Sequence, residues 1–260
     1  MMIGKAGPAV SGICTSDASS IEVRGQDLVN GLMGEFSFTE YFFFLVTGAR
    51  PSAEQRYFLD LLLVAIAEHG LTPTAQAARM TLAAAPDSLQ GAVAAGILGC
   101  GTVVLGTSEL CAQVLAEAAA RVDAGEAPDA AAHAVASAIR GRGGKMPGFG
   151  HPIHHPLDPR AERILALARE RGVAGRHVDM LERLRGAVAA AWGKPMPLNV
   201  SGPIAAVLMD LDFPPAMTKA IPILARTAGI LGHLAEEQRR PIGFLLAHHA
   251  ENAIAYDPAG

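Results

Sequence analysis

The sequence predicts an all-α protein. Half of its 260 residues are hydrophobic, alanine and leucine abound, and only 5% are aromatic. Alanine and leucine favour helices, and closely packed helices accommodate many small residues. Helix start and stop signals recur along the chain, whereas no alternating apolar run of convincing length indicates a strand. The length suits one large domain or two domains with a substantial core.

The first two predicted helices begin at capping boxes. Ser37 and Glu40 have the required spacing before the apolar run FFFLV, and a glycine follows as a stop signal. Ser52 and Gln55 repeat the spacing before LLLVAIAEH, which ends at Gly70. In both boxes a side-chain oxygen can accept from backbone N–H groups that a helix start leaves unpaired.

The later helices are predicted from apolar periodicity and from proline and glycine punctuation. Asp158 is a suitable N-cap, and Pro159 occupies the first helical position of PRAERILALARER. The other predicted helices cover residues 87–100, 108–122, 129–140, 177–192, 202–212, 215–238 and 242–254.

One long segment, GRGGKMPGFGHPIHHP at residues 141–156, interrupts this pattern. Its five glycines and three prolines cannot continue a helix. Long irregular segments in compact helical proteins are often functional, because rigid elements on either side hold them in place. We therefore expect binding or catalytic residues here.

Charge and cysteine content limit the functional classes. The net charge of −4, with no long run of one sign, does not fit a nucleic-acid partner. Cys14, Cys100 and Cys111 are odd in number and form no CxxC motif, which favours a reducing compartment. The N-terminal residues lack the apolar segment of a signal peptide, so we expect a cytoplasmic protein.

The uncharged stretch from Ser88 to Ser108 is long enough to raise the question of a membrane span. Its five glycines, the polar Gln90 and Thr102, and the lack of basic or aromatic flanking residues argue against one. We expect a core or dimer-interface helix pair, no membrane association and at least a homodimer.

The irregular segment resembles a known signature. Pro147-Gly148-Phe149-Gly150-His151, followed by Asp158-Pro159-Arg160-Ala161, closely resembles the GFGH…DPRA motif of citrate synthases. Further motifs agree in order over roughly residues 20–245, and the compact length resembles citryl-CoA lyase modules more than full citrate synthases. These motifs are Arg24-Gly25, Glu68-His69-Gly70, Leu198-Asn199-Val200, Ala225-Arg226-Thr227 and Gly232-His233.

The resemblance to the citrate synthase superfamily implies a two-domain, almost wholly helical homodimer. On that pattern, residues 1–106 and 219–260 form a large helical domain, and residues 107–218 form a smaller inserted domain that closes over a cleft. The implied activity makes or cleaves a carbon–carbon bond between a CoA thioester and an oxo-acid, through a thioester enolate.

The resemblance also implies roles for individual residues. His69 and His151 match positions that bind and polarise the oxo-acid, and imidazole suits proton exchange near neutral pH. Arg160 and Arg226 match positions that hold carboxylates, which a planar guanidinium can bind with two parallel hydrogen bonds. For CoA we expect contacts from the glycine-rich segment, at Arg142, Lys145, Gly148 and Gly150. The choice of Arg142 and Lys145 rests on charge complementarity with the phosphates of CoA.

Three departures separate this chain from citrate synthases. Ser201 stands where the family has its catalytic aspartate, and a hydroxyl is no general base near neutral pH without an activating partner. Val104 replaces an enolate-stabilising histidine, a change that citryl-CoA lyase modules share. Arg240-Pro241-Ile242 lacks the second arginine of the synthase RPR motif. Fewer carboxylate-binding groups predict a partner smaller or less acidic than oxaloacetate, and ordinary citrate synthesis is disfavoured.

Three functions remain open. A lyase or condensing enzyme can recruit another base, with Glu109, Asp158 and His154 as candidates. A decarboxylating reaction needs enolate stabilisation alone. A catalytically silent thioester-binding or regulatory subunit needs neither a base nor enolate stabilisation. We favour the first, because His69, His151 and both arginines are kept. No metal is expected, since His151, His154 and His155 lack a zinc-like spacing with further ligands.

Overall fold

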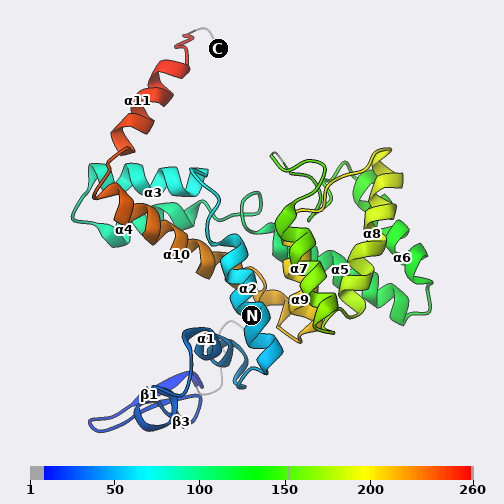
Figure 1. Ribbon diagram of the computed structural model, residues 1–260, viewed down its shortest axis with the longest axis horizontal. Coiled ribbons are helices and arrows are strands. Elements are labelled where there is room, and N and C mark those ends of the chain that lie inside the picture. Colours follow the sequence, from blue (N-terminus) through cyan, green and yellow to red (C-terminus); the bar gives the residue numbers. More distant parts are fainter. Residues whose placement is uncertain (1–8, 152, 259–260) are drawn as a thin grey trace. The chain divides into compact units, whose positions relative to one another are not determined.

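The computed structural model describes residues 9–151 and 153–258 and confirms the all-α prediction. The described residues form eleven α-helices, with only short strands near the start (Figure 1). The chain divides into two compact units, one up to Asp60 and one from Leu61 onward. Residues 1–8, on which the expectation about a signal peptide rests, lie outside the described part.

The unit that ends at Asp60 contains three antiparallel strands in the order β1-β2-β3: Cys14–Ser16, Ile21–Val23 and Gln26–Asp27. With two or three residues each, they are too short to show the alternation by which strands are recognised in a sequence. A π-helical turn, Leu28–Leu32, and helix α1, Phe38–Thr47, follow.

Both capping boxes form as predicted. Glu40 N donates to Ser37 Oγ (3.3 Å), and Ser37 N donates to Glu40 Oε2 (2.8 Å). Ser52 and Gln55 make the equivalent pair at the start of α2, Ala53–Ala67. Helix α2 crosses the boundary between the two units and ends three residues before Gly70, so His69 lies in the turn beyond it.

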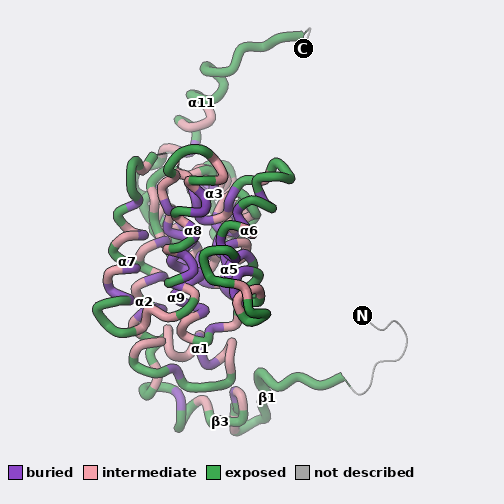
Figure 2. Tube along the Cα trace, turned by 90° about the vertical axis from the view of Figure 1, so that its right-hand side faces the viewer, coloured by how far each residue is buried: buried purple, intermediate pink, exposed green. Residues whose placement is uncertain are grey.

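Within the unit that begins at Leu61, one group of packed helices comprises α3 (Pro73–Ala84), α4 (Leu89–Leu98), α10 (Ala220–Glu237) and α11 (Gly243–Ala253) (Figure 1). Its core contains Ala78, Leu82, Ala92, Ile230 and Leu234. Within α11 only Gly243 is buried, Leu246 and Ala247 are intermediate, and the rest of the helix is exposed (Figure 2).

Helix α3 is not among the helices predicted from the sequence, and one predicted helix joins two separate elements near residue 215. The N-cap of α3, Thr72, makes no capping bond with its side chain, so the usual start signal is weak. The single helix predicted for 215–238 is a 3-10 turn, Pro215–Met217, followed by α10. Pro222 lies in the first turn of α10, where the missing N–H of proline has no helical partner to lose.

A second group comprises α5 (Thr107–Asp123), α6 (Pro128–Gly141), α7 (Pro159–Glu170), α8 (Arg176–Trp192) and α9 (Ser201–Asp210). Helix α9 packs against α5, α7 and α8, and each of its residues from Ser201 to Met209 is buried. These helices fall within residues 107–218, but the predicted division into a large and an inserted small domain stays a prediction.

The uncharged stretch at 88–108 contains the ten-residue α4 and the turns after it. No helix in the described part of the chain has the length and apolar character needed to cross a membrane. Leu98 and Val103 are 86% and 87% exposed. The predicted dimer interface in this region is not tested by a single chain and stays a prediction.

Asp210 fixes the start of α8 from the end of α9. Its carboxylate accepts from the backbone N of Gly175, His177 and Val178, each at 2.9 Å, and lies 2.8 Å from His177 Nδ1. Burial opposes its ionisation, but these hydrogen bonds outweigh burial and lower the pKa of Asp210.

We predict that Asp210→Asn lowers the free energy of unfolding by about 1–3 kcal/mol, because buried donors lose an acceptor. The carboxylate has a lowered pKa in the fold, so its contribution is present above the unfolded pKa of about 4 and disappears as pH falls through the folded value. Urea unfolding at pH 7 and pH 3 measures both effects. The exposed Asp179→Asn, in the first turn of α8, is the charge-matched control. Equal losses for both variants at pH 7 would contradict this account.

Candidate active site

The glycine-rich segment is attached to the stretch that precedes α9. Phe149 and Leu198 form an antiparallel bridge, Gly150 N donates to Pro197 O (2.8 Å), and Asn199 N donates to Gly148 O (2.8 Å). The Asn199 side chain adds a second connection: Nδ2 donates to Gly150 O (2.9 Å), and Oδ1 accepts from Ser201 N (3.0 Å). These bonds fix the backbone at Gly150, next to His151, relative to the start of α9.

Two glycines make this attachment possible. Gly148 and Gly150 have φ angles of 80° and 88°, a region that L side chains rarely adopt. A Cβ atom on Gly148 would also lie 2.8 Å from Cys111 Sγ and 3.3 Å from Gly202 Cα. Gly148 is therefore enclosed by protein. The predicted contact of Gly148 and Gly150 with CoA stays a prediction.

Asp158 anchors the other end of the segment. The side chain is fully buried and accepts from Arg160 N, Nε and Nη2 (2.9–3.1 Å) and from Val200 N (3.2 Å). Burial opposes ionisation, but the hydrogen bonds and charge of Arg160 outweigh it and lower the pKa of Asp158. A carboxylate so stabilised is a weak base, which argues against Asp158 as the replacement for the family aspartate.

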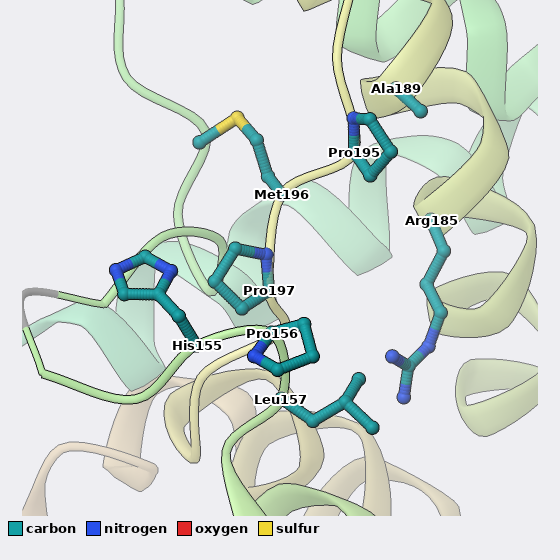
Figure 3. A pocket seen from close by; sticks show the side chains of 8 residues that line it. All are labelled: His155, Pro156, Leu157, Arg185, Ala189, Pro195, Met196 and Pro197. Atoms are coloured by element: carbon teal, nitrogen blue, oxygen red, sulfur yellow. The ribbon is translucent and has the colours of Figure 1, made fainter.

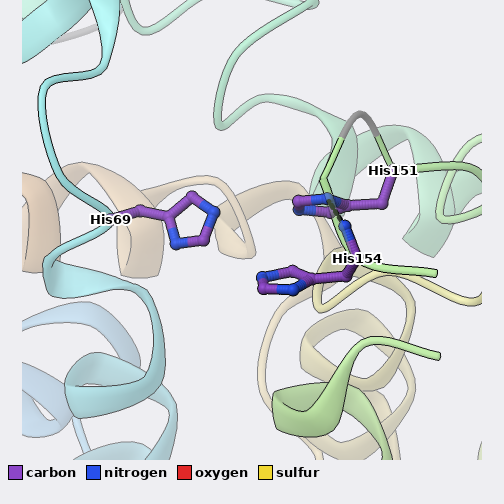
Figure 4. A group of neighbouring side chains, drawn as sticks. All are labelled: His69, His151 and His154. Carbon is purple, nitrogen blue, oxygen red and sulfur yellow. Dashed lines mark hydrogen bonds between the residues drawn. The ribbon is translucent and has the colours of Figure 1, made fainter.

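The structure brings three imidazoles together: His69 beyond α2, and His151 and His154 from the glycine-rich segment (Figure 4). The ring centroids of His151 and His154 are 4.4 Å apart, and His69 lies 5.3 Å from His154 and 5.7 Å from His151. One nitrogen from each ring lies within 4.8 Å of the others. An oxygen placed among three such atoms is at most ~2.8 Å from each, a hydrogen-bonding distance.

Two of these histidines are held neutral near pH 7. The pKa of His69 is lowered by burial, then by the positive charges of Arg160 and Arg226, although Asp158 acts in the opposite direction. The pKa of His151 is lowered by burial, then by His154 and Arg160, although Asp158 acts in the opposite direction. Neutral imidazoles beside fixed cations form a site that favours a negatively charged or strongly polarised oxygen.

Backbone hydrogen bonds set the tautomer of His151. Its Nδ1 faces the N–H groups of Ile153 (3.0 Å) and His154 (2.9 Å) and must accept from them. The proton of the neutral ring therefore sits on Nε2. His151 is thus prepared to donate a hydrogen bond, which suits polarisation of a carbonyl and agrees with the role predicted for it.

Arg226, on α10, is a buried cation with unused donors. It is 3% exposed, and its Nε and Nη1 have no partner among the described residues, while Nη2 reaches Ile66 O at 3.4 Å. Burial lowers its pKa, although Glu68 opposes this. A buried guanidinium without an acceptor is costly unless an anion completes it. A bound carboxylate would supply that anion.

The three histidines also have the spacing of a metal site, since one nitrogen from each ring lies within 4.8 Å of the others. The hydrogen bonds of His151 disfavour this use, because a metal ligand must offer a lone pair. Its Nδ1 lone pair already receives two N–H groups, and its Nε2 carries the proton. The donor set fits an anionic or carbonyl oxygen better than a cation, and the expectation of no metal stays a prediction.

Ser201 begins α9 and is 7% exposed. Its Oγ lies 2.7 Å from Oγ1 of Thr107, the first residue of α5. No hydrogen bond joins Ser201 to the histidines among the described residues; its connection to them runs through Asn199. The sequence analysis did not single out Thr107 or the Asn199 side chain, because their importance depends on contacts between distant segments.

The predicted CoA-binding cations, Arg142 and Lys145, are both exposed between α6 and the Gly148 turn. A cavity of about 580 Å³ lies at the other end of the segment (Figure 3). Arg185, on its wall, is already paired with Glu162 and Glu182 at 2.9 Å each. The cavity is lined by His155, Pro156, Leu157, Arg185, Ala189, Pro195, Met196 and Pro197.

Comparison with known protein families shows which family the chain belongs to. Residues 10–243 match the family described as "Citrate synthase, C-terminal domain". The chain belongs to the citrate synthase family. Among solved structures, citryl-CoA lyase from Hydrogenobacter thermophilus is similar to this family member with a TM-score of 0.85 and 26% sequence identity, over 97% of this chain and 95% of that one. The resemblance inferred from the GFGH and DPRA motifs is thereby confirmed.

More distant structures share the fold of this citrate synthase family member. An ATP citrate lyase from Methanothrix soehngenii, in complex with citrate and coenzyme A, has a TM-score of 0.80 at 20% identity, over 99% of this chain and 43% of that one. Citrate synthase from Thermotoga maritima has a TM-score of 0.63 at 22% identity, over 77% and 53%. A search of curated proteins gave no match.

We predict that Arg226→Met raises the free energy of unfolding of the ligand-free protein by about 1–3 kcal/mol, because it removes buried donors that lack acceptors. The same change should abolish stabilisation by oxaloacetate or citrate. Thermal unfolding with and without each acid measures both effects, and the exposed Arg239→Met is the control. A destabilised variant that still responds to the acids would show that Arg226 is structural.

Proposed function

We propose that the chain is a citryl-CoA lyase-like enzyme. It makes or cleaves a carbon–carbon bond between a CoA thioester and an oxo-acid, through a thioester enolate. The observation that carries the proposal is the cluster of His69, His151 and His154 beside Arg226, a buried cation whose Nε and Nη1 have no acceptor among the described residues. The similarity to a citryl-CoA lyase along nearly the whole length of both chains supports the same reaction class.

The roles follow from the geometry. His151 donates from Nε2 to the oxygen that alternates between the hydroxyl of the citryl thioester and the carbonyl of the oxo-acid. Arg226 binds a carboxylate of the oxo-acid, and Arg160, held by Asp158, adds a second positive charge near His69. His69 contributes a neutral imidazole with a buried Nε2 that has no partner among the described residues.

We propose that CoA lies along the glycine-rich segment. Arg142 and Lys145 are exposed and suit its phosphates. The cavity of about 580 Å³ beyond His155 has a mainly apolar wall of prolines, Leu157 and Met196, and it falls in the size range of ligand pockets. A cytoplasmic homodimer, with residues 107–218 as the smaller domain, belongs to the same proposal.

Ser201 supports a second candidate, a thioester-binding or regulatory protein without lyase activity. Its hydroxyl is paired with Thr107, and neither group is a general base near neutral pH. The retained histidine cluster makes this candidate the weaker one, because binding alone does not require three facing imidazoles.

The test is cleavage of citryl-CoA by the purified protein, with free CoA, acetyl-CoA and oxaloacetate followed by mass spectrometry. We expect turnover by the wild type and a loss of about 10²–10⁴-fold in His151→Ala, because the donor to the developing charge is gone. CoA should still raise the melting temperature of His151→Ala.

Ser201→Asp separates the two candidates. If the wild type is inactive but binds CoA, and Ser201→Asp cleaves citryl-CoA, the chain is a binding protein on an intact lyase scaffold. Undiminished turnover in His151→Ala would contradict the proposed site outright.

A further inference from the structure

The proposed lyase lacks a base at the position where its family has an aspartate, so another group must carry the proton. Overall, cleavage of a citryl thioester moves one proton from the hydroxyl oxygen to the methylene carbon beside the thioester. The two atoms are only two bonds apart in the substrate. A single group can therefore reach both, provided that it can accept and release a proton near neutral pH.

Two members of the histidine cluster are poorly suited to this task. His151 receives two backbone N–H groups at Nδ1, and its Nε2 already carries the proton, so it has no free lone pair. His69 lies beside Arg160 and Arg226, whose charges oppose a further positive charge on its ring. Ser201 is paired with Thr107, and Asp158 with Arg160.

His154 remains. Its backbone N is bonded to His151, which fixes its place in the chain, and its ring, like that of His69 but unlike that of His151, makes no hydrogen bond among the described residues. Its ring centroid lies 4.4 Å from that of His151, with the two planes tilted by 37°, and 5.3 Å from that of His69, so His154 is the member nearest to both others (Figure 4). It is half-buried, which leaves its ring nitrogens within reach of a ligand.

We propose that His154 is the catalytic residue that replaces the family aspartate, as a proton shuttle. Its imidazole takes the proton from the substrate hydroxyl while the bond between the hydroxyl-bearing carbon and the methylene carbon breaks. The hydroxyl carbon becomes the carbonyl of the oxo-acid, and the bonding electrons form the thioester enolate. The imidazolium then returns the proton to the enolate carbon, which becomes a methyl group. Nothing is oxidised or reduced.

This assignment rests on the proposed lyase function but makes a separate prediction. In the reverse direction, His154 must remove a proton from the methyl group of acetyl-CoA. That step is visible without carbon–carbon bond formation, as exchange of methyl protons for deuterium in D₂O when malate, which cannot condense, fills the place of the oxo-acid.

The experiment compares wild type, His154→Gln and His133→Gln, in citryl-CoA cleavage and in methyl exchange. Glutamine keeps the backbone N–H that binds His151 but cannot accept and release a proton near neutral pH, and His133 is an exposed histidine on α6. We expect His154→Gln to lose at least about a hundredfold in both rates while CoA and citrate still raise its melting temperature. His133→Gln should match the wild type.

Cleavage or exchange within threefold of wild type in His154→Gln would overturn the assignment, as would a wild type that exchanges no deuterium. The proposed lyase function and the assignment of His154 can be rejected independently. Exchange without cleavage in the wild type, lost in His154→Gln, would keep His154 as the base while rejecting citryl-CoA as the substrate. Cleavage that survives in His154→Gln would keep the lyase and reject the shuttle.

Discussion

The attachment of the glycine-rich segment to the start of α9 is the constraint on which the site depends. Gly148 and Gly150 adopt positive φ angles so that their backbone can pair with Pro197 and Asn199, and Asp158 ties the far end to Val200. Because α9 is buried from Ser201 to Met209, this attachment rests on the most enclosed helix of its group. The histidines of the segment thereby gain fixed positions without belonging to a helix themselves.

The electrostatics of the site follow from what that attachment buries. Asp158 is paired with Arg160 and caps the start of α7, so its negative charge is already neutralised. Arg226 remains buried without a full set of acceptors, and burial keeps His69 and His151 neutral. The result is a cluster of hydrogen-bond donors and positive charge, in which the neighbouring carboxylates Asp158 and Glu68 already have partners. Such a cluster suits a carboxylate-bearing substrate, and it favours imidazole over a carboxylate as the group that transfers the proton.

Much of the fold was readable from local signals. The two capping boxes, the Asp158-Pro159 start and most helix positions are confirmed, because each depends on residues close together in the chain. Helix α3 and the break before α10 were not predicted. The N-cap side chain of α3 makes no capping bond, so the start signal is weak. Before α10, the two prolines at the 3-10 turn do not by themselves show where the helix begins, and tertiary packing sets that boundary. The meeting of His69 with His151 was suggested by family motifs. The roles of Asn199 and Thr107 depend on hydrogen bonds between distant segments. The tautomer of His151 depends on local backbone hydrogen bonds within an irregular segment, and no periodicity reveals either.

The proposed function requires that this cluster binds an oxo-acid, with His151 as the donor to its carbonyl. The most direct measurement is the ¹³C resonance of oxaloacetate labelled at its carbonyl carbon, free and bound to the protein. The account predicts a downfield shift on binding, because a donated hydrogen bond draws electrons from the carbonyl carbon, and it predicts that His151→Ala loses most of that shift while the ligand remains bound. A bound ligand whose carbonyl resonance stays at its position in water, or shifts equally in His151→Ala, would contradict it.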